Sequence, residues 1–322
     1  MATNVHRLLR HGASLPALLA FRTINIPPIE KHLFRSHVRA KEVHQQSLPT
    51  LSKTEIEIVR GLEQEGVFVT SLAELALDGT AEMIVAGEEL STALANALAR
   101  PYHFSGRRVV GSDAATMANY RAILRWGLNL SLLHIVEAYL GLPVAYDGPK
   151  VAYTAADGRQ AGTRLWHRDR EDRRMMKVAI YLTDVPESGG PLQCIKSRVF
   201  DGPVDRDFNY PVLSHAQLEQ KLGRTISDNE ITSCAGPAGT VVFMDTARLF
   251  HRGKPAVSVA RRAVFHSYFS RSPRHPFFCE RSDLSRSELT SFVKGMSPAQ
   301  REAVLWRDEL NGPMRLVPPS LT

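Results

Sequence analysis

The sequence has no apolar run that approaches the ~20 residues needed to span a bilayer, so we expect no membrane span. It is also poor in cysteine. Cys194, Cys234 and Cys279 are far apart and form no CxxC pair, which argues against a zinc site and against a disulfide framework. We therefore expect buried or half-buried free thiols in a protein of a reducing compartment, the cytoplasm.

Acidic residues are absent before Glu30, and this absence makes the charge uneven. Residues 1–42 carry seven Lys or Arg against two Glu, so most of the formal net charge of +7 lies in this tail. A basic tail is not a nucleic-acid-binding face, and we expect no nucleic-acid partner. The tail has two interpretations: a mitochondrial transit peptide, or a basic arm that packs on the domain or on a partner subunit. Few serines and no evident cleavage site favour the arm.

Helical patterns occupy the region after this arm. Ser52 followed by Glu55 fits a capping box, and Gly66 stops the helix that it opens. A short strand at 67–69, a second helix at 81–99 and one or two helices at 113–141 follow.

From Val151 onward, short apolar runs alternate with Gly, Pro and Asp turns, which is typical of a sandwich or barrel and not of βαβ units. The runs lie at 151–155, 163–169, 176–185, 191–196, 239–245, 248–253 and 261–269. We therefore expect a β-rich α+β protein. Its parts are a basic arm at 1–50 and a single domain at 51–322, with a helical part at 51–145, a β core at 150–270, a long loop at 201–230 and C-terminal helices at 283–310.

His167 and Asp169 are the candidate centre of the chemistry. In an extended strand, side chains i and i+2 leave the same face, so the imidazole and the carboxylate project side by side. Such a pair needs one more His to form a facial triad for Fe(II), and His251 is the candidate. Arg261 or Arg262, at the start of the next strand, supplies a guanidinium that can grip a dicarboxylate such as 2-oxoglutarate.

The sequence resembles the phytanoyl-CoA dioxygenase-like family of Fe(II)/2-oxoglutarate oxygenases over about residues 150–270. The resemblance rests on WHRDREDRRMMKVAIYLTDVPESGGPLQCIKS, GPAGTVVFMDTARLFHRG and RRAVFHSYFS. It implies a double-stranded β-helix (jelly-roll) core with N-terminal and C-terminal helices packed outside. It also implies an enzyme that uses Fe(II), 2-oxoglutarate and O₂ to hydroxylate an aliphatic C–H of a small molecule, such as a lipid, an amino acid or a secondary metabolite, with release of succinate and CO₂.

By the same resemblance, His167, Asp169 and His251 are the iron ligands, and Arg261 pairs with the distal carboxylate of 2-oxoglutarate. Arg262 is the alternative, because only one of two neighbouring strand residues can face the metal. Related halogenases replace the Asp by a small residue, so the presence of Asp169 favours hydroxylation. Desaturation, epimerisation and ring closure by the same iron chemistry stay open.

The chain departs from the family pattern at two places. A Pro-Gly-Ser-His-like turn is replaced by Ile195-Lys196-Ser197-Arg198, and the small polar residue expected two positions after the distal His is Gly253. Both changes can alter contacts with the substrate or co-substrate, and neither touches the ligands.

Two other functions compete with the oxygenase. A non-catalytic jelly-roll binding protein has no need for a complete triad plus an arginine. A cupin-type metalloenzyme typically shows His-x-His, which this chain lacks. The cluster Arg164, Arg168, Arg170, Arg173 and Arg174 has two interpretations, a site for an anionic phosphate or carboxylate substrate, and a solvated loop with local ion pairs. Neither the substrate nor the oligomeric state can be read from the sequence.

Overall fold

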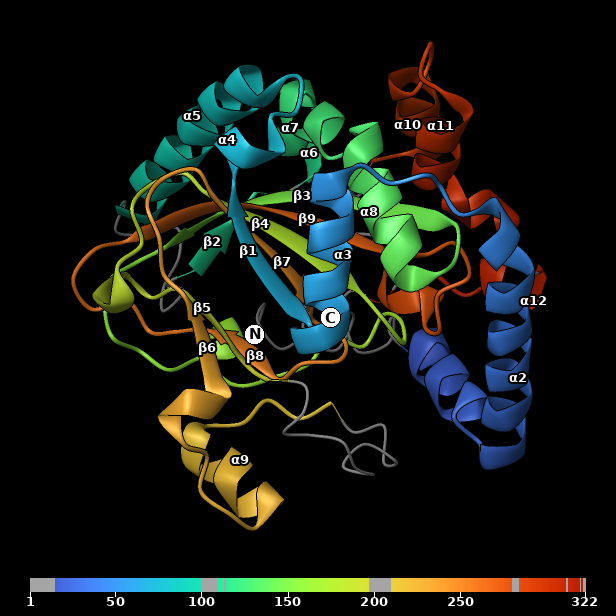
Figure 1. Ribbon diagram of the computed structural model, residues 1–322, viewed down its shortest axis with the longest axis horizontal. Helices are drawn as coiled ribbons and strands as arrows, with labels where there is room; N and C mark the ends of the chain where they lie inside the picture. Colours follow the sequence, from blue (N-terminus) through green and yellow to red (C-terminus); the bar gives the residue numbers. More distant parts are fainter. Residues whose placement is uncertain are drawn as a thin grey trace, which may run out of the picture.

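The protein has a mixed α/β fold in which two antiparallel sheets are surrounded by helices (Figure 1). The computed structural model describes residues 15–99, 109–112, 114–196, 210–279, 284–310, 312–318 and 320. Within these ranges the strands are β1 (Val67–Ser71), β2 (Val109–Gly111), β3 (Val144–Thr154), β4 (Met176–Tyr181), β5 (Leu192–Ile195), β6 (Ile231–Cys234), β7 (Thr240–Asp245), β8 (His251–Gly253) and β9 (Arg261–Ser270).

Helices occupy the predicted regions, although 113–141 holds three helices and not one or two, and the helix at 27–44 in the arm was not predicted. The helices are α2 (Pro27–His44), α3 (Lys53–Glu65), α4 (Leu72–Leu75), α5 (Thr80–Ala99), α6 (Ala114–Met117), α7 (Arg121–Trp126), α8 (Leu130–Leu140), α9 (His215–Leu222), α10 (Arg286–Phe292), α11 (Pro298–Val304) and α12 (Gly312–Arg315). The Ser52–Glu55 capping box is present at α3, and Gly66 ends this helix in the left-handed conformation.

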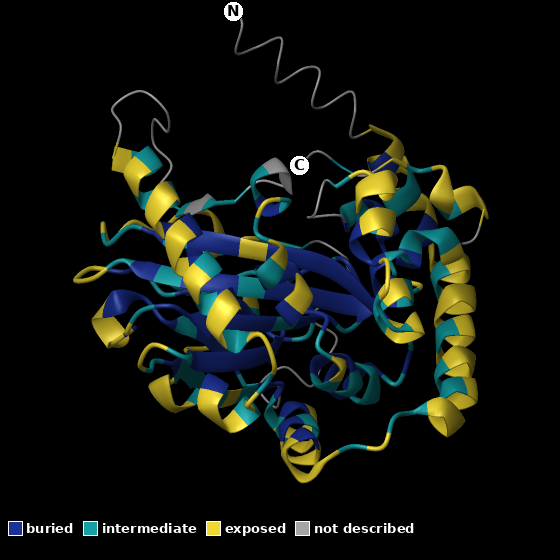
Figure 2. Cartoon of the chain, turned by 90° about the horizontal axis from the view of Figure 1, so that it is seen from above, coloured by how far each residue is buried: buried dark blue, intermediate teal, exposed yellow. Residues whose placement is uncertain are grey.

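The large sheet has the strand order β1-β7-β4-β9-β3-β2, and the small sheet the order β6-β5-β8. Alternate residues of the large sheet face opposite sides. Val178, Val241 and Val264 pack on one side against the apolar stripes of α3, α5, α7, α8 and α11. Ala179 and Val242 face the other side, toward the small sheet. Figure 2 shows the strands as a buried layer and places most exposed residues on the surrounding helices.

Several predicted boundaries are corrected. The run at 163–169 is not a strand: a 3₁₀ turn at Gly162–Arg164 leads into isolated bridges at Trp166 and His167. The run at 248–253 shortens to β8, because its first half forms the turn after β7. The edge strands β2 and β6 were not predicted. They are short, and pairing with β3 and β5 defines them.

The N-terminal arm is helical at 15–24 and again in α2. It contacts the domain through Ala17 and Ile24, which pack with Phe277, whereas α2 buries no residue. Residues 1–14 and the first part of the predicted loop, up to 209, lie outside the described ranges. The three cysteines are free and buried. In the described chain, every helix is too short or too polar to traverse a bilayer.

Candidate metal centre

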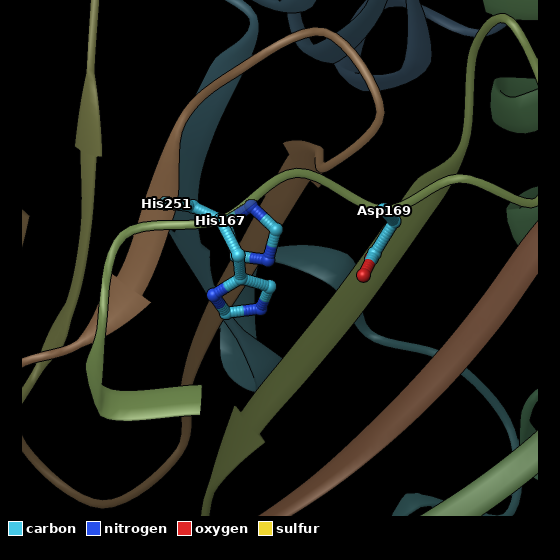
Figure 3. A group of neighbouring side chains, drawn as sticks. All are labelled: His167, Asp169 and His251. Carbon is cyan, nitrogen blue, oxygen red and sulfur yellow. The ribbon is translucent and has the colours of Figure 1, made fainter. Parts of the chain in front are cut away.

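His167, Asp169 and His251 meet at the edge between the two sheets (Figure 3). The backbones of His167 and His251 pair as an antiparallel bridge, with N–H···O distances of 3.0 and 2.9 Å. Asp169 is fixed by a bond of 2.8 Å from its N–H to the carbonyl of Thr246. The two neighbouring ligands are therefore aligned by pairing with a distant segment, and not by the regular strand that the sequence predicts.

The donor set fits a divalent transition metal. One ligand atom from each of the three residues lies within 4.8 Å of the others. The Nδ1 of His167 is 2.8 Å from the carbonyl of Leu165, and the Nδ1 of His251 is 3.1 Å from that of Leu249. A carbonyl only accepts, so each Nδ1 carries the proton and each Nε2 presents a lone pair, as metal-binding histidines require.

Burial keeps both imidazoles neutral. It is the largest cause that lowers the pKa of His167, and it lowers the pKa of His251 well below the ordinary value, with a further contribution from nearby His167. A neutral imidazole is the form that binds a metal ion. The two rings lie with their centroids 4.3 Å apart. Two neutral nitrogen donors beside one carboxylate are the ligand set of the facial triad.

Asp169 also forms an ion pair with Lys177, the second residue of β4. Both side chains are largely buried. A carboxylate has two oxygens and several lone pairs, so it can bind a metal ion while one oxygen accepts from an ammonium group. Lys177 thus holds the orientation of Asp169. The position of Lys177 beside Asp169 depends on the register of β4, which the sequence does not give.

His167 and His251 line a cavity of about 130 Å³, and so does Lys177, the ion-pair partner of Asp169. Arg261 lines this cavity and is 6% exposed, and its Nη1 donates to the carbonyl of Gly190. Arg262 faces the opposite side of β9, where its Nη1 donates to Thr92 Oγ1 at 2.9 Å. Of the two candidate arginines, the structure therefore places only Arg261 with the triad.

Several other lining residues come from strands of the large sheet. Lys150 and Thr154 on β3, and Phe265 and Ser267 on β9, line the cavity and were missed by sequence reasoning. All four face the same side of the sheet as Arg261, because β3 and β9 pair with Thr154 opposite Arg261 and alternate residues of each strand share a side. Lys150 and Lys177 join Arg261 as the cations of this lining. The cavity therefore favours an anion.

Gly253 has a physical reason to be glycine. A Cβ at this position would lie 2.5 Å from Nη2 of Arg261, closer than side chains approach. The absence of a side chain makes room for the guanidinium that enters the cavity. The second departure from the family pattern is the segment 195–198. Its Lys196 donates from Nζ to the carbonyl of Asn229 at 2.8 Å, and residues 197–198 lie outside the described ranges.

The arginine cluster predicted at 164–174 does not form one site. Arg164 is buried in an ion pair with Asp157, and Arg174 donates to the carbonyl of Tyr139 at 3.0 Å. Arg170 lies over the ring of Phe278, with Cζ 3.7 Å from the ring centroid. Arg168 and Arg173 point into a different cavity, on the reverse side of the ligand segment. These arginines therefore contribute nothing to the cavity beside the triad.

No family model matches the sequence, and no curated protein matches it. Solved structures give distant likenesses. The carbocyclase SnoK from nogalamycin biosynthesis, a non-heme alpha-ketoglutarate-dependent protein, is 16% identical, with a TM-score of 0.48 over 78% of this chain and 93% of that one. The epimerase SnoN in complex with Fe³⁺, alpha-ketoglutarate and nogalamycin RO is 14% identical, with a TM-score of 0.47 over 72% and 88%. HygX from Streptomyces hygroscopicus, with nickel and 2-oxoglutarate bound, is 15% identical, with a TM-score of 0.46 over 69% and 88%. Likenesses this distant leave any assignment to the geometry of the site.

Proposed function

We propose that this protein is an Fe(II)- and 2-oxoglutarate-dependent dioxygenase that hydroxylates an aliphatic C–H of a small molecule. The observation that carries the proposal is the meeting of His167, Asp169 and His251 beside a cavity into which Arg261 points. Two imidazoles and one carboxylate leave half of an octahedral coordination sphere for other ligands. A buried guanidinium within the same cavity is the partner that a small dicarboxylate needs.

The fold is consistent with a double-stranded β-helix of the phytanoyl-CoA dioxygenase-like kind. Its two halves would be the six-stranded and three-stranded antiparallel sheets, with helices on the outer face of the larger one. The triad lies where the sheets meet, since His251 opens β8 of the small sheet and Asp169 leads into β4 of the large one. The sequence motifs quoted above support the same family.

The residues divide the work between them. His167, Asp169 and His251 would hold the iron. The bonds from Nδ1 of the two histidines to backbone carbonyls would fix the imidazoles, and Lys177 would fix the carboxylate of Asp169. Arg261 would bind the distal carboxylate of 2-oxoglutarate. When bound, iron with 2-oxoglutarate and O₂ supplies the oxidising power that converts C–H to C–OH, with release of succinate and CO₂.

Apolar side chains complete the cavity. Leu192, Val242 and Phe265 line it between the charged residues, and a lining of this kind limits the water beside the metal ligands. Asp169 fills the third protein position of the triad, which favours hydroxylation over halogenation.

The proposal is tested by succinate release. The protein is reconstituted anaerobically with Fe(II), given 2-oxoglutarate, and exposed to O₂ without added substrate. We expect slow uncoupled turnover in the wild type, its loss in His167→Ala and Asp169→Ala, and wild-type turnover in the control His134→Ala, which changes a half-buried histidine on α8 away from the triad. Wild-type turnover in both triad variants would refute the assignment.

A further inference from the structure

A second cavity, of about 340 Å³, lies on the reverse side of the segment that carries His167 and Asp169. Four arginines from three separate parts of the chain line it: Arg168, Arg173, Arg248 and Arg274. Its acidic lining residues are Glu30 of α2 and Asp172. Its size falls at the lower end of the range for small-molecule sites, roughly 300–1,000 Å³.

The two cavities lie on opposite sides of the same backbone segments, because successive side chains of an extended segment point to opposite sides. His167 lines the cavity of the candidate metal centre, and the next residue, Arg168, lines the second one. The same alternation places His251 on the metal side and Phe250 on the other. The second cavity is thus separate from the metal centre, although both are built on the same two segments.

Positive charge exceeds negative charge in this lining. The carboxylate of Asp172 already accepts from the backbone N–H groups of Arg173, Ser270 and Arg274 and from the Ser270 hydroxyl. Glu30 lies 3.5 Å from Nη2 of Arg274. Two carboxylates, one of them saturated by these bonds, therefore face four guanidinium groups.

The arginines are also partly withdrawn from water. Burial is the largest cause that lowers the pKa of Arg173 and of Arg274, and the charge of Arg173 lowers that of Arg274 further. Like charges that are desolvated together repel one another, and a bound anion removes both costs.

Three of the guanidinium groups are held in place by neighbours. The Cζ of Arg168 lies 5.3 Å from the ring centroid of Phe250, on the wall shared with the metal centre. Arg274 donates to Asn25 Oδ1 at 2.9 Å, and Arg248 to the carbonyl of Glu63 at 3.5 Å. Pre-organised donors lose little conformational entropy when a ligand arrives.

We propose that this cavity is a binding site for the phosphate group of a small anionic molecule. Guanidinium groups bind phosphate through paired N–H donors, and a tetrahedral dianion can accept from several arginines that approach from different sides. A planar carboxylate engages fewer of them. The site is independent of the proposed oxygenase chemistry, since none of its lining residues is a candidate metal ligand.

The test is direct titration with inorganic phosphate and with pyrophosphate, followed by calorimetry and by thermal unfolding at constant ionic strength. We expect saturable binding and a raised Tm in the wild type. Arg168→Gln and Arg274→Gln should each weaken binding by about tenfold or more, since each removes a charge-assisted contact. Arg173→Gln gives a third variant if either of these fails to fold.

Two controls separate the site from other effects. Arg301→Gln removes an exposed arginine on α11, outside the cavity, and should bind phosphate as the wild type does. His167→Ala should also retain phosphate binding, so failure of the metal assignment leaves this test intact. Wild-type affinity in the cavity variants, or a Tm shift no larger than that given by chloride, would overturn the proposal. Tighter binding of malonate than of phosphate would overturn the choice of ligand.

Discussion

Replacement of Gly253 by alanine tests whether Arg261 anchors a dicarboxylate. A Cβ at this position would lie 2.5, 3.1 and 3.2 Å from Nη2, Nη1 and Cζ of Arg261. Ordinary contacts between such atoms are about 3.5–4.0 Å, so the guanidinium must retreat. It has little freedom to do so, because it is 6% exposed and its Nη1 donates to the carbonyl of Gly190. Gly190 cannot easily yield, since it packs against the backbone of Lys254.

The magnitude follows from the contact that is displaced. A hydrogen bond to a charged group contributes about 1.5–3 kcal/mol, which corresponds to roughly 10- to 150-fold in affinity. We therefore expect Gly253→Ala to weaken 2-oxoglutarate binding by at least about tenfold. Metal affinity should change little, because the nearest atoms to the added Cβ all belong to Arg261 and not to a candidate ligand.

The assay is calorimetric titration of 2-oxoglutarate into protein incubated with Mn²⁺, which would occupy the proposed metal site without supporting turnover. Gly312→Ala is the matched control, since a Cβ at Gly312 meets no atom within 4 Å. If Gly253→Ala binds 2-oxoglutarate with the affinity of the wild type, the role given to Arg261 is wrong.

Four further substitutions test the candidate site and the packing of the fold. Arg261→Gln should weaken 2-oxoglutarate binding by about tenfold or more, whereas Arg262→Gln, on the opposite face of β9, should leave it unchanged; equal effects in the same titration would contradict this. Burial raises the pKa of Asp245 above its usual 3.8, so as pH rises from about 4 through the raised value the unfolded state loses its proton first and the folded state loses stability. Asp245→Asn should remove this decline, which urea unfolding of both proteins at several pH values measures. If the free energy of unfolding falls equally with pH in the wild type and the variant, the interpretation is wrong. Leu62→Ala, at a fully buried position of α3, should lower the free energy of unfolding by about 2–5 kcal/mol in the same assay, and a loss below about 1 kcal/mol would contradict the packing described.

Local signals in the sequence predicted the elements whose ends depend on neighbouring residues alone. The Ser52–Glu55 pair and Gly66 defined the ends of α3, because capping depends on neighbouring residues alone. The apolar run after Arg261 predicted β9 to within one residue. Edge strands such as β2 and β6 depend on their partners, and short mixed sequences carry little signal of pairing.

The candidate site also combines features that local sequence predicted with features that only the fold defines. The sequence paired His167 with Asp169 through the spacing of an extended strand, but the structure aligns them through bonds to His251 and Thr246. The structure brings the three predicted ligands within 4.8 Å of one another, although the local geometry behind the prediction was wrong. The contact of Lys177 with Asp169 needed the register of β4, which no pattern in the sequence gives.

The four arginines of the second cavity illustrate the limit most clearly. Arg168 and Arg173 belong to a cluster visible in the sequence, but Arg248 and Arg274 join them from 75 or more positions away. The sequence cluster itself disperses, because Arg164, Arg170 and Arg174 each contact a different partner. Convergence of like charges is a property of the fold and not of the spacing.

Anaerobic titration with Fe(II) in the presence of 2-oxoglutarate measures the central claim most directly, because the keto acid chelated to ferrous iron absorbs visible light. The wild type should bind one iron per chain and develop this absorption, and His251→Ala and Asp169→Ala should not. A wild type without the absorption, or variants that develop it fully, would show that these three side chains do not form the iron site.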